Sequence, residues 1–294
     1  MPPAVVCASG FLLATFLALA SRPLLASAAD PAAVALKPDT VAGFDRYVAL
    51  TEARNGEELR HGTNLLWIDG LKDNERAEAS AALKRGEVKM KKLETRENGE
   101  RIRCPDGMIH HWAGVAFIPG VRLQDILRVL QDYDHHAQYY APDVERSKIE
   151  SRDGDHFRVF LRFRRHKVIT VVLNTEHDVH YFRDSETREH SRSSAVHIAE
   201  VENPGKPNER EKPPGEDGGF LWRMETWWRL EERDGGVYVQ SEVVSLTRDI
   251  PAGLGWLIGP VVTSIPKETL TFTLEATRKA VSSAGSAASA PKSR

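Results

Sequence analysis

The chain has 294 residues and a formal net charge of −2, so Lys and Arg nearly balance Asp and Glu. This balance excludes the strong basic bias that is typical of nucleic-acid-binding proteins, and we expect no nucleic-acid partner. A chain of this length can bury about 70–75% of its unfolded surface, so it can form a core without disulfides.

Residues 1–29 have the pattern of a secretory signal peptide. Residues 11–20 are apolar, and Ala26-Ser27-Ala28 follows with the small-residue spacing of a cleavage site. Cleavage would leave Cys104 as the remaining cysteine, so no intramolecular disulfide is expected. The alternative is an uncleaved membrane anchor, because residues 3–25 are long enough to span a bilayer. We therefore expect an exported protein, periplasmic or secreted.

Residues 30–85 are predicted to be a helical N-terminal extension. Residues 41–85 are either a separate partner-binding piece or part of the outer wall of the domain. Within residues 41–71, four apolar side chains fit one helical face: Phe44, Tyr47, Val48 and Leu50. Residues 74–85 form a second, alanine-rich helix that Gly86 can end.

A sheet is predicted to follow, interrupted by one amphipathic helix at residues 121–140. The first expected strands are residues 87–95 and 100–103, which pair through an Asn98-Gly99 turn. The others are residues 108–118, 145–151, 157–163, 168–173 continuing at 179–182, and 187–201, which is polar enough to be an edge strand or a solvent-facing one. Residues 203–219 hold four prolines and no large apolar residue, which predicts a mobile loop.

The last third of the sequence predicts a hairpin followed by a helix. Residues 220–232 and 237–247 flank the turn Asp234-Gly235-Gly236, whose glycines supply the positive φ angles of hairpin turns. An apolar loop leads to a helix from Pro266 to Val281, with Ser264 as its cap. Residues 282–294 are predicted to be a disordered tail.

Runs of strands with helices grouped around them indicate the α+β class. Three stretches carry a resemblance to the START-like (SRPBCC, helix-grip) superfamily: residues 110–144, 157–173 and 237–281. The resemblance covers residues 86–281 and implies a curved antiparallel sheet wrapped around a long C-terminal helix. It also implies a cavity for a lipid, sterol, polyketide or other apolar molecule. Most such proteins bind or carry their ligand, and a minority, such as aromatase/cyclases, catalyse.

Strand alternation predicts the wall of this cavity. Its candidate lining residues share one face of the strand at residues 220–232: Trp222, Met224, Thr226, Trp228 and Leu230. Thr226 would be the polar group of an otherwise apolar pocket. On the terminal helix, Leu270 and Leu274 lie on one face with Thr277 and Val281, as a cavity floor. The alternative for both sets is an ordinary packed core.

The apolar loop at residues 253–262 is a candidate gate. It holds Trp256, Leu257 and Ile258 among glycines, which is unusual for an exposed loop. We expect it to cover the cavity or to dip transiently into a membrane surface, where tryptophan is favoured. The alternative is a loop packed under the sheet.

The charged and histidine-rich segments are expected to be structural. Arg162 and Arg164 alternate with Phe163, which places them on the convex, solvent-facing side. The histidine pairs 110–111, 135–136 and 177/180 would point to opposite faces, so no metal site is expected. No phosphate-, dinucleotide-, zinc- or serine-nucleophile motif occurs, so no cofactor is expected either.

The sequence thus favours an exported START-like protein that binds, and can carry, a hydrophobic small molecule or lipid. Catalytic residues are not assigned. One alternative is a cyclase- or aromatase-like enzyme that uses polar cavity groups such as Thr226, Asp134 or His111. Another is an interaction module that binds no ligand, with its aromatic residues fully packed.

Overall fold

The structure, a computed structural model, describes residues 35–62, 64–167, 169–250 and 255–289; of residues 255–262 and 285–289 it describes the backbone only. The helices are α1 (Pro38–His61), α2 (Asp73–Lys84), α3 (Leu123–Leu130), the 3-10 turn η1 (Tyr133–His135), α4 (His136–Tyr139) and α5 (Gly255–Ser289). The predicted signal peptide, residues 1–29, lies outside the described residues.

The strands form one large antiparallel sheet and one small hairpin. They are β1 (Lys89–Lys92), β2 (Arg96–Glu97), β3 (Glu100–Arg101), β4 (Gly107–Pro119), β5 (Val144–Asp153), β6 (His156–His166), β7 (Thr170–Arg183), β8 (Arg188–Glu202), β9 (Arg210–Glu211), β10 (Arg223–Arg233) and β11 (Gly236–Arg248). The large sheet has the order β1-β4-β11-β10-β8-β7-β6-β5, with β9 beside β8, while β2 and β3 pair separately.

Both predicted hairpin turns are confirmed. Asn98 and Gly99 have φ angles of 50° and 85°, and Asp234 and Gly235 have φ angles of 56° and 75°. Two consecutive residues with positive φ are the requirement of a type I′ turn, whose twist matches that of paired strands. These turns connect β2 to β3 and β10 to β11.

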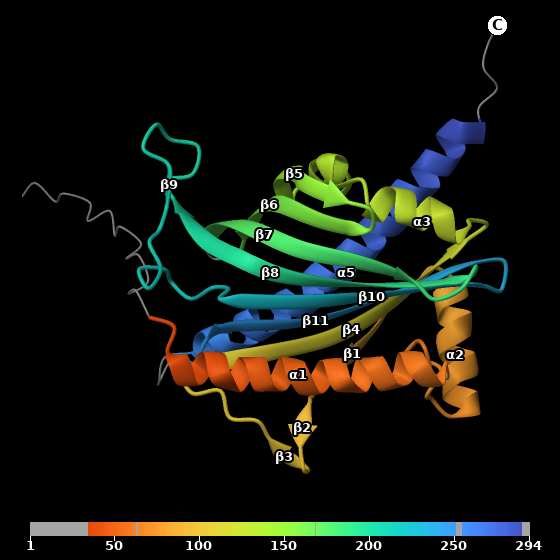
Figure 1. The fold of residues 1–294 in the computed structure, drawn as a ribbon, viewed down its shortest axis with the longest axis horizontal. Helices are drawn as coiled ribbons and strands as arrows, with labels where there is room; N and C mark the ends of the chain where they lie inside the picture. The colour runs from red at the N-terminus through yellow and green to blue at the C-terminus, as the bar shows by residue number, and fades with distance from the viewer. Residues whose placement is uncertain (1–34, 63, 168, 251–254, 290–294) are drawn as a thin grey trace, which may run out of the picture. The chain divides into compact units, whose positions relative to one another are not determined.

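Helix α5 lies along one face of the curved sheet, which we call the concave face (Figure 1). The helix approaches the sheet closely at Gly114 of β4, where an added Cβ atom would lie 2.6 Å from Leu274 Cδ1. The core on this side joins α3 and α5 to the sheet through Ile118, Leu123, Leu230 and Phe157, all at most 1% exposed. This is the α+β helix-grip arrangement that the sequence predicts.

The N-terminal extension covers the opposite, convex face of β4, β10 and β11. From α1, Phe44, Tyr47 and Val48 pack in one cluster with Trp227 and Leu246. From α2 and the segment before it, Leu66, Ile68 and Leu83 pack in another cluster with Phe117 and Tyr238. The extension is therefore an integral outer layer of the fold, which is the second of the two alternatives that the sequence leaves open.

Polar bonds also attach α1 to the convex face. The hydroxyl of Tyr47 accepts a hydrogen bond from Thr95 N at 2.8 Å and lies 2.9 Å from His111 Nδ1. His111 Nε2 lies 2.8 Å from Glu242 Oε1, and Glu242 also pairs with Arg54 of α1. All of these groups except Arg54 are at least nine-tenths buried. The network joins α1 to Thr95, which follows β1, and to the strands β4 and β11.

Several predicted elements differ from the structure. The helix expected at residues 121–140 is broken after Leu130, because Asp132 leaves the helical region (φ −86°, ψ 58°) and accepts bonds from His135 and Tyr139. Residues 89–92 pair with β4 and not with β3. The strand expected at the sheet edge, β8, is central, between β10 and β7.

The segment at residues 203–219, predicted as a mobile loop, contains β9 and is held by charged groups. Arg162 Nη2 lies 2.8 Å from Glu209 Oε1, and Asn174 donates to Glu211 at 2.7 Å. This segment buries Arg162 to 6% exposure, so the prediction that Arg162 faces solvent was wrong. Charged and polar side chains therefore attach this segment, which has no large apolar residue, to β6 and β7.

Candidate functional site

The centre of the concave face is a row of side chains from five adjacent strands. Trp228 of β10 pairs with Ser241 of β11 on one side and with Ser191 of β8 on the other. Because directly paired residues point to the same face of a sheet, the three side chains lie together on the concave side. The row continues to Gly114 of β4 and Tyr181 of β7.

Burial divides the concave face into two zones. In the zone beside α3, the apolar side chains are fully buried, as shown by Val237, Leu230 and Phe157 at 0–1% exposure. In the other zone the apolar side chains are only half-buried: Trp112, Leu161, Trp228 and Val243. The second zone therefore has apolar wall that the described side chains do not cover completely.

Two hydroxyl groups in this row have no hydrogen-bond partner among the described residues. Ser191 and Ser241 are each 1% exposed, and neither Oγ atom finds a donor or acceptor within the described part of the protein. An unpartnered buried hydroxyl costs on the order of 1–3 kcal/mol, so such groups usually bind a water or a ligand. Both flank Trp228, which places two available polar groups beside an aromatic ring.

A hydrogen-bonded polar chain lies on the concave side of β7 and β8, beyond this row. His177 Nε2 lies 2.9 Å from Thr175 Oγ1, and His177 Nδ1 lies 3.3 Å from Ser193 Oγ. Burial lowers the pKa of His177 to about 4, so the ring is neutral at pH 7. Ser193 pairs with Thr226 across β8 and β10, so this chain reaches the predicted polar residue of the pocket.

The far end of the concave face carries a perturbed carboxyl group. Burial, with the nearby charges of Asp155 and Asp184, raises the pKa of Glu189 to about 7, against the opposing charge of Arg183. Glu189 lies opposite Leu230 on the concave side of β8. Sequence reasoning missed this residue, because β8 was expected at the sheet edge, where a glutamate is solvated.

The structure brings together most of the predicted lining residues. Trp228, Leu270 and Leu274 pack in one apolar cluster between the sheet and α5. Strand alternation places Met224 and Thr226 on the same face of β10 as Trp228, and both are half-buried. Sequence reasoning missed the serines of β8 and β11 that face them.

Trp222 does not share this face. It precedes the first paired residue of β10 and packs with Trp227 and Phe44 on the convex side. Its indole Nε1 donates to Asp217 at 2.9 Å, which turns the side chain away from the concave face. The alternation rule fails here because the chain has not yet entered the strand at residue 222.

The predicted gate is part of a helix. Backbone at residues 255–262 belongs to α5, so the expectation of a loop and of a helix start near Pro266 with Ser264 as its cap was wrong. Pro266 has no backbone N–H to donate, so it removes one hydrogen bond of the helix. The remaining backbone bonds of this 35-residue helix are enough to continue it through the proline. The side chains of Trp256, Leu257 and Ile258 lie outside the described residues, and their gating role stays a prediction. The same helix extends to Ser289, so residues 282–289 are helical and not part of the disordered tail that was predicted for residues 282–294.

The residues suggested for an enzyme do not converge. His111 is buried on the convex side beneath α1, while Thr226 lies on the concave side. Asp134 is exposed and accepts a hydrogen bond from Ile149 N at 2.8 Å. Burial raises the pKa of the Cys104 thiol to about 11, so this half-buried cysteine is a poor nucleophile.

The histidine pairs separate as predicted, but one histidine gains a partner from another strand. His177 faces the concave side, and His180 lies on the convex side directly opposite His156 of β6. Spacing within one strand gives no signal for such a pairing.

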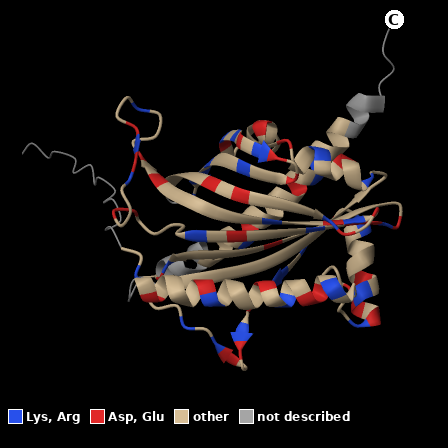
Figure 2. Cartoon of the chain, in the orientation of Figure 1, with Lys and Arg blue, Asp and Glu red and all other residues tan. Residues whose placement is uncertain are grey.

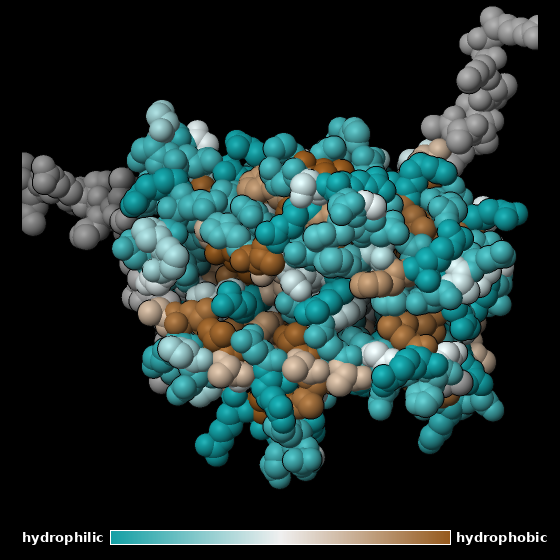
Figure 3. All heavy atoms as spheres, viewed as in Figure 1, coloured by the Kyte–Doolittle hydropathy of each residue, from teal (hydrophilic) through white to brown (hydrophobic). Residues whose placement is uncertain are grey.

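The outer surface is mixed in charge and shows no extended apolar patch in the view drawn. Lysine, arginine, aspartate and glutamate alternate along α1 and α2 (Figure 2). Hydrophobic atoms appear in small separate groups among hydrophilic ones (Figure 3). Open depressions of about 710 Å³ along α1 and about 360 Å³ at the β10–β11 turn lie away from the concave row. Among the described residues, no helix is both long and apolar enough to cross a bilayer.

No family model and no curated protein matches the sequence. Solved structures that resemble the chain include a STAR-related lipid transfer protein from Xanthomonas axonopodis (17% identity, 66% of this chain and 98% of that chain, TM-score 0.43). Human STARD10 is 11% identical, and the match covers 74% of this chain and 84% of that chain with a TM-score of 0.41. The Zhui aromatase/cyclase of a Streptomyces species is 12% identical, and the match covers 62% of this chain and 99% of that chain with a TM-score of 0.41. The helix-grip fold of this chain is established by its own strand order and by the position of α5 on the concave face.

Proposed function

We propose that this chain is an exported protein that binds an apolar small molecule, most simply a lipid, between the concave face and α5, and carries it. The single observation that supports this best is the pair of buried, unpartnered hydroxyls of Ser191 and Ser241 beside Trp228. A polar head group would satisfy the hydroxyls.

The apolar part of such a ligand would contact the half-buried zone of the concave face. Trp112, Leu161 and Val243 supply apolar surface there, and α5 lies over the same face. Burying apolar surface of a ligand contributes about 25 cal/mol per Å², so even a short acyl chain would gain several kcal/mol. Export follows from the predicted signal peptide, and transient contact with a membrane is part of the same proposal.

Two adjacent tryptophans provide a matched test of this site. Trp228 faces the concave side, while Trp227 faces α1 on the convex side. We expect a brominated fatty acid, added to the mature protein, to quench its tryptophan fluorescence. Trp228→Phe should remove a larger part of this quenching than Trp227→Phe, because bromine quenches at short range and only Trp228 of this pair borders the site.

Native mass spectrometry of the protein purified without detergent, followed by solvent extraction, would identify a natural ligand. A lipid present at one molecule per chain is the expected result. Equal quenching in both tryptophan variants, together with a ligand-free mass, would contradict the proposal and favour the interaction-module alternative.

A further inference from the structure

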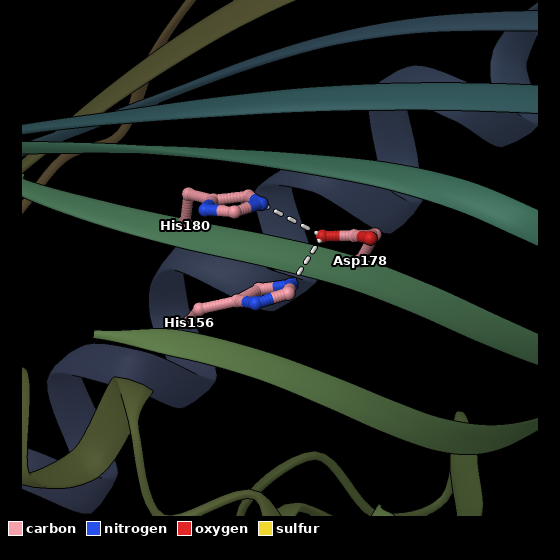
Figure 4. A group of neighbouring side chains, drawn as sticks. All are labelled: His156, Asp178 and His180. Carbon is pink, nitrogen blue, oxygen red and sulfur yellow. Dashed lines mark hydrogen bonds and ion pairs between the residues drawn. The ribbon is translucent and has the colours of Figure 1, made fainter. Parts of the chain in front are cut away.

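The outer, convex side of β6 and β7 carries a group of three side chains unrelated to the concave face. His156 lies on β6, and Asp178 and His180 lie on β7. Figure 4 shows the two imidazole rings in parallel, with the carboxylate of Asp178 pointing between their ring nitrogens. Asp178 Oδ1 lies 2.8 Å from His156 Nε2 and 2.9 Å from His180 Nε2.

We propose that His156, Asp178 and His180 form a binding site for a divalent transition-metal ion, with Zn²⁺ as the first choice. The three ligand atoms lie within 4.8 Å of one another, and two imidazoles with one carboxylate form a donor set that suits zinc. Nitrogen donors favour Zn²⁺, Cu²⁺ and Ni²⁺ over Mg²⁺ and Ca²⁺. This inference is independent of the proposed function.

The ligand atoms are close enough for one ion, but both imidazole rings would have to rotate. The rings are stacked in parallel, so their Nε2 lone pairs do not meet at one point until the rings turn out of this arrangement. Tetrahedral zinc with bonds of about 2.0–2.1 Å holds its ligand atoms about 3.3 Å apart, which is about 0.5 Å more than the present distances from each nitrogen to the carboxylate oxygen. The metal would displace the proton through which each Nε2 contacts Asp178, and each neutral imidazole would then carry its proton on Nδ1. The fourth position would be a water, because the side chains of the three residues are 30–46% exposed.

The backbone and neighbouring side chains hold these ligands in place. Asp178 and His180 are two residues apart on one strand, and His156 pairs directly with His180, so regular sheet geometry sets their positions. Without a metal the imidazole rings stack at 4.0 Å with an angle of 8°, and the ring of Phe182 lies 6.2 Å from that of His180. Arg158 Nη1 holds Asp178 Oδ2 at 3.2 Å, which leaves Oδ1 directed at the histidines.

A second histidine–carboxylate contact on the protein surface serves as the matched control. His197 Nε2 lies 3.1 Å from Glu211 Oε2, but among the described residues no third ligand side chain completes a metal-binding group with this pair. A single histidine and a carboxylate bind zinc far more weakly than three ligands do, so His197→Gln tests for non-specific effects of the same chemical change.

The test is isothermal titration of the full mature chain, purified without a histidine tag and stripped with a chelator, with ZnCl₂. We expect one zinc ion per chain, at least a tenfold loss of affinity in His156→Gln and in His180→Gln, and unchanged affinity in His197→Gln. Circular dichroism would verify that each surface variant is folded. Co²⁺ should give the visible absorption of a four-coordinate site in the wild type and in His197→Gln only. Absence of zinc binding, or equal affinity in all four proteins, would overturn the proposal.

Discussion

At the scale of single residues, Tyr47 is held by two buried hydrogen bonds on the convex side. Its hydroxyl accepts from Thr95 N and donates toward His111 Nδ1, which leaves His111 Nε2 to donate to Glu242. Burial lowers the pKa of His111, although its bond to Glu242 acts in the opposite direction, so the ring stays neutral at pH 7. One hydroxyl therefore fixes the tautomer of the histidine and the position of α1.

Tyr47→Phe should lower the free energy of unfolding by about 1–3 kcal/mol, because it leaves a buried backbone N–H and a buried ring nitrogen unpaired. Urea denaturation at pH 7 measures this loss. Tyr139→Phe is the control, since the Tyr139 hydroxyl bonds Asp132 where water can replace it. If both variants lose the same free energy of unfolding, the buried hydrogen bonds of Tyr47 stabilise the fold no more than an exposed hydrogen bond does.

The residue scale also shows where sequence reasoning stops. Alternation along β10 correctly places Met224, Thr226 and Trp228 on one face, because a strand has a period of two. It fails at Trp222, which lies one residue before the first pair of the strand. Ser191 and Ser241 carry no signal of their own in the sequence, since only strand order shows that they flank Trp228.

At the scale of elements, turns and periodic patterns predicted most of the strands, but not their neighbours. Glycine turns determine which strands follow each other in hairpins, as at Asp234-Gly235. The position of β8 between β10 and β7 depends on long-range pairing, and its polar side chains pack against other polar groups, such as Ser193 against His177. Polarity alone therefore misplaced β8 at the edge.

The contact between α5 and β4 is an element-scale feature that a substitution can test. A Cβ atom at Gly114 would lie 2.6 Å from Leu274 Cδ1 and 2.7 Å from Met90 Sδ. Gly114→Val should therefore cost about 1–3 kcal/mol of stability by overpacking.

Thermal or urea unfolding measures the effect of Gly114→Val. The control is Gly56→Ala in α1, where a Cβ atom would meet nothing within 4 Å and helix propensity should raise stability by about 0.5–1 kcal/mol. If the Gly114→Val protein is as stable as the wild type, α5 does not pack closely against β4 at Gly114.

At the scale of the whole molecule, buried histidines connect stability to pH. Burial lowers the pKa of His110 and of His136 to about 4, with a small further effect of Lys92 on His110. In the unfolded chain the pKa of histidine is about 6.5, so between these values the unfolded state binds more protons than the folded state. The stabilisation is complete above pH 6.5 and is lost as the pH falls toward 4.

We expect the free energy of unfolding to fall between pH 7 and pH 5, by on the order of 1–2 kcal/mol for each of His110, His136 and His177, whose pKa values are all lowered to about 4. Glu189 offsets part of this fall, because its pKa is raised to about 7 and the folded state therefore takes up a proton over the same range. Urea denaturation at the two pH values measures it, and His110→Gln should flatten the dependence. His135→Gln should steepen it, because Asp132 raises the pKa of His135, so this histidine stabilises the fold at low pH. Stability that stays constant or rises on acidification would contradict this account.

The small side chains of the concave face determine how the sequence of this protein can change during evolution. Around Trp228, the central wall carries four small side chains in two adjoining rows across β8, β10 and β11: Ser191, Ser193, Thr226 and Ser241. The large residues that hold the layers together lie nearer α3. Exchanging a serine for alanine, threonine or valine would reshape the inner surface one methyl group at a time while those packed layers stay intact. If the concave face binds the ligand proposed above, its ligand preference can change in small steps while every intermediate sequence still folds.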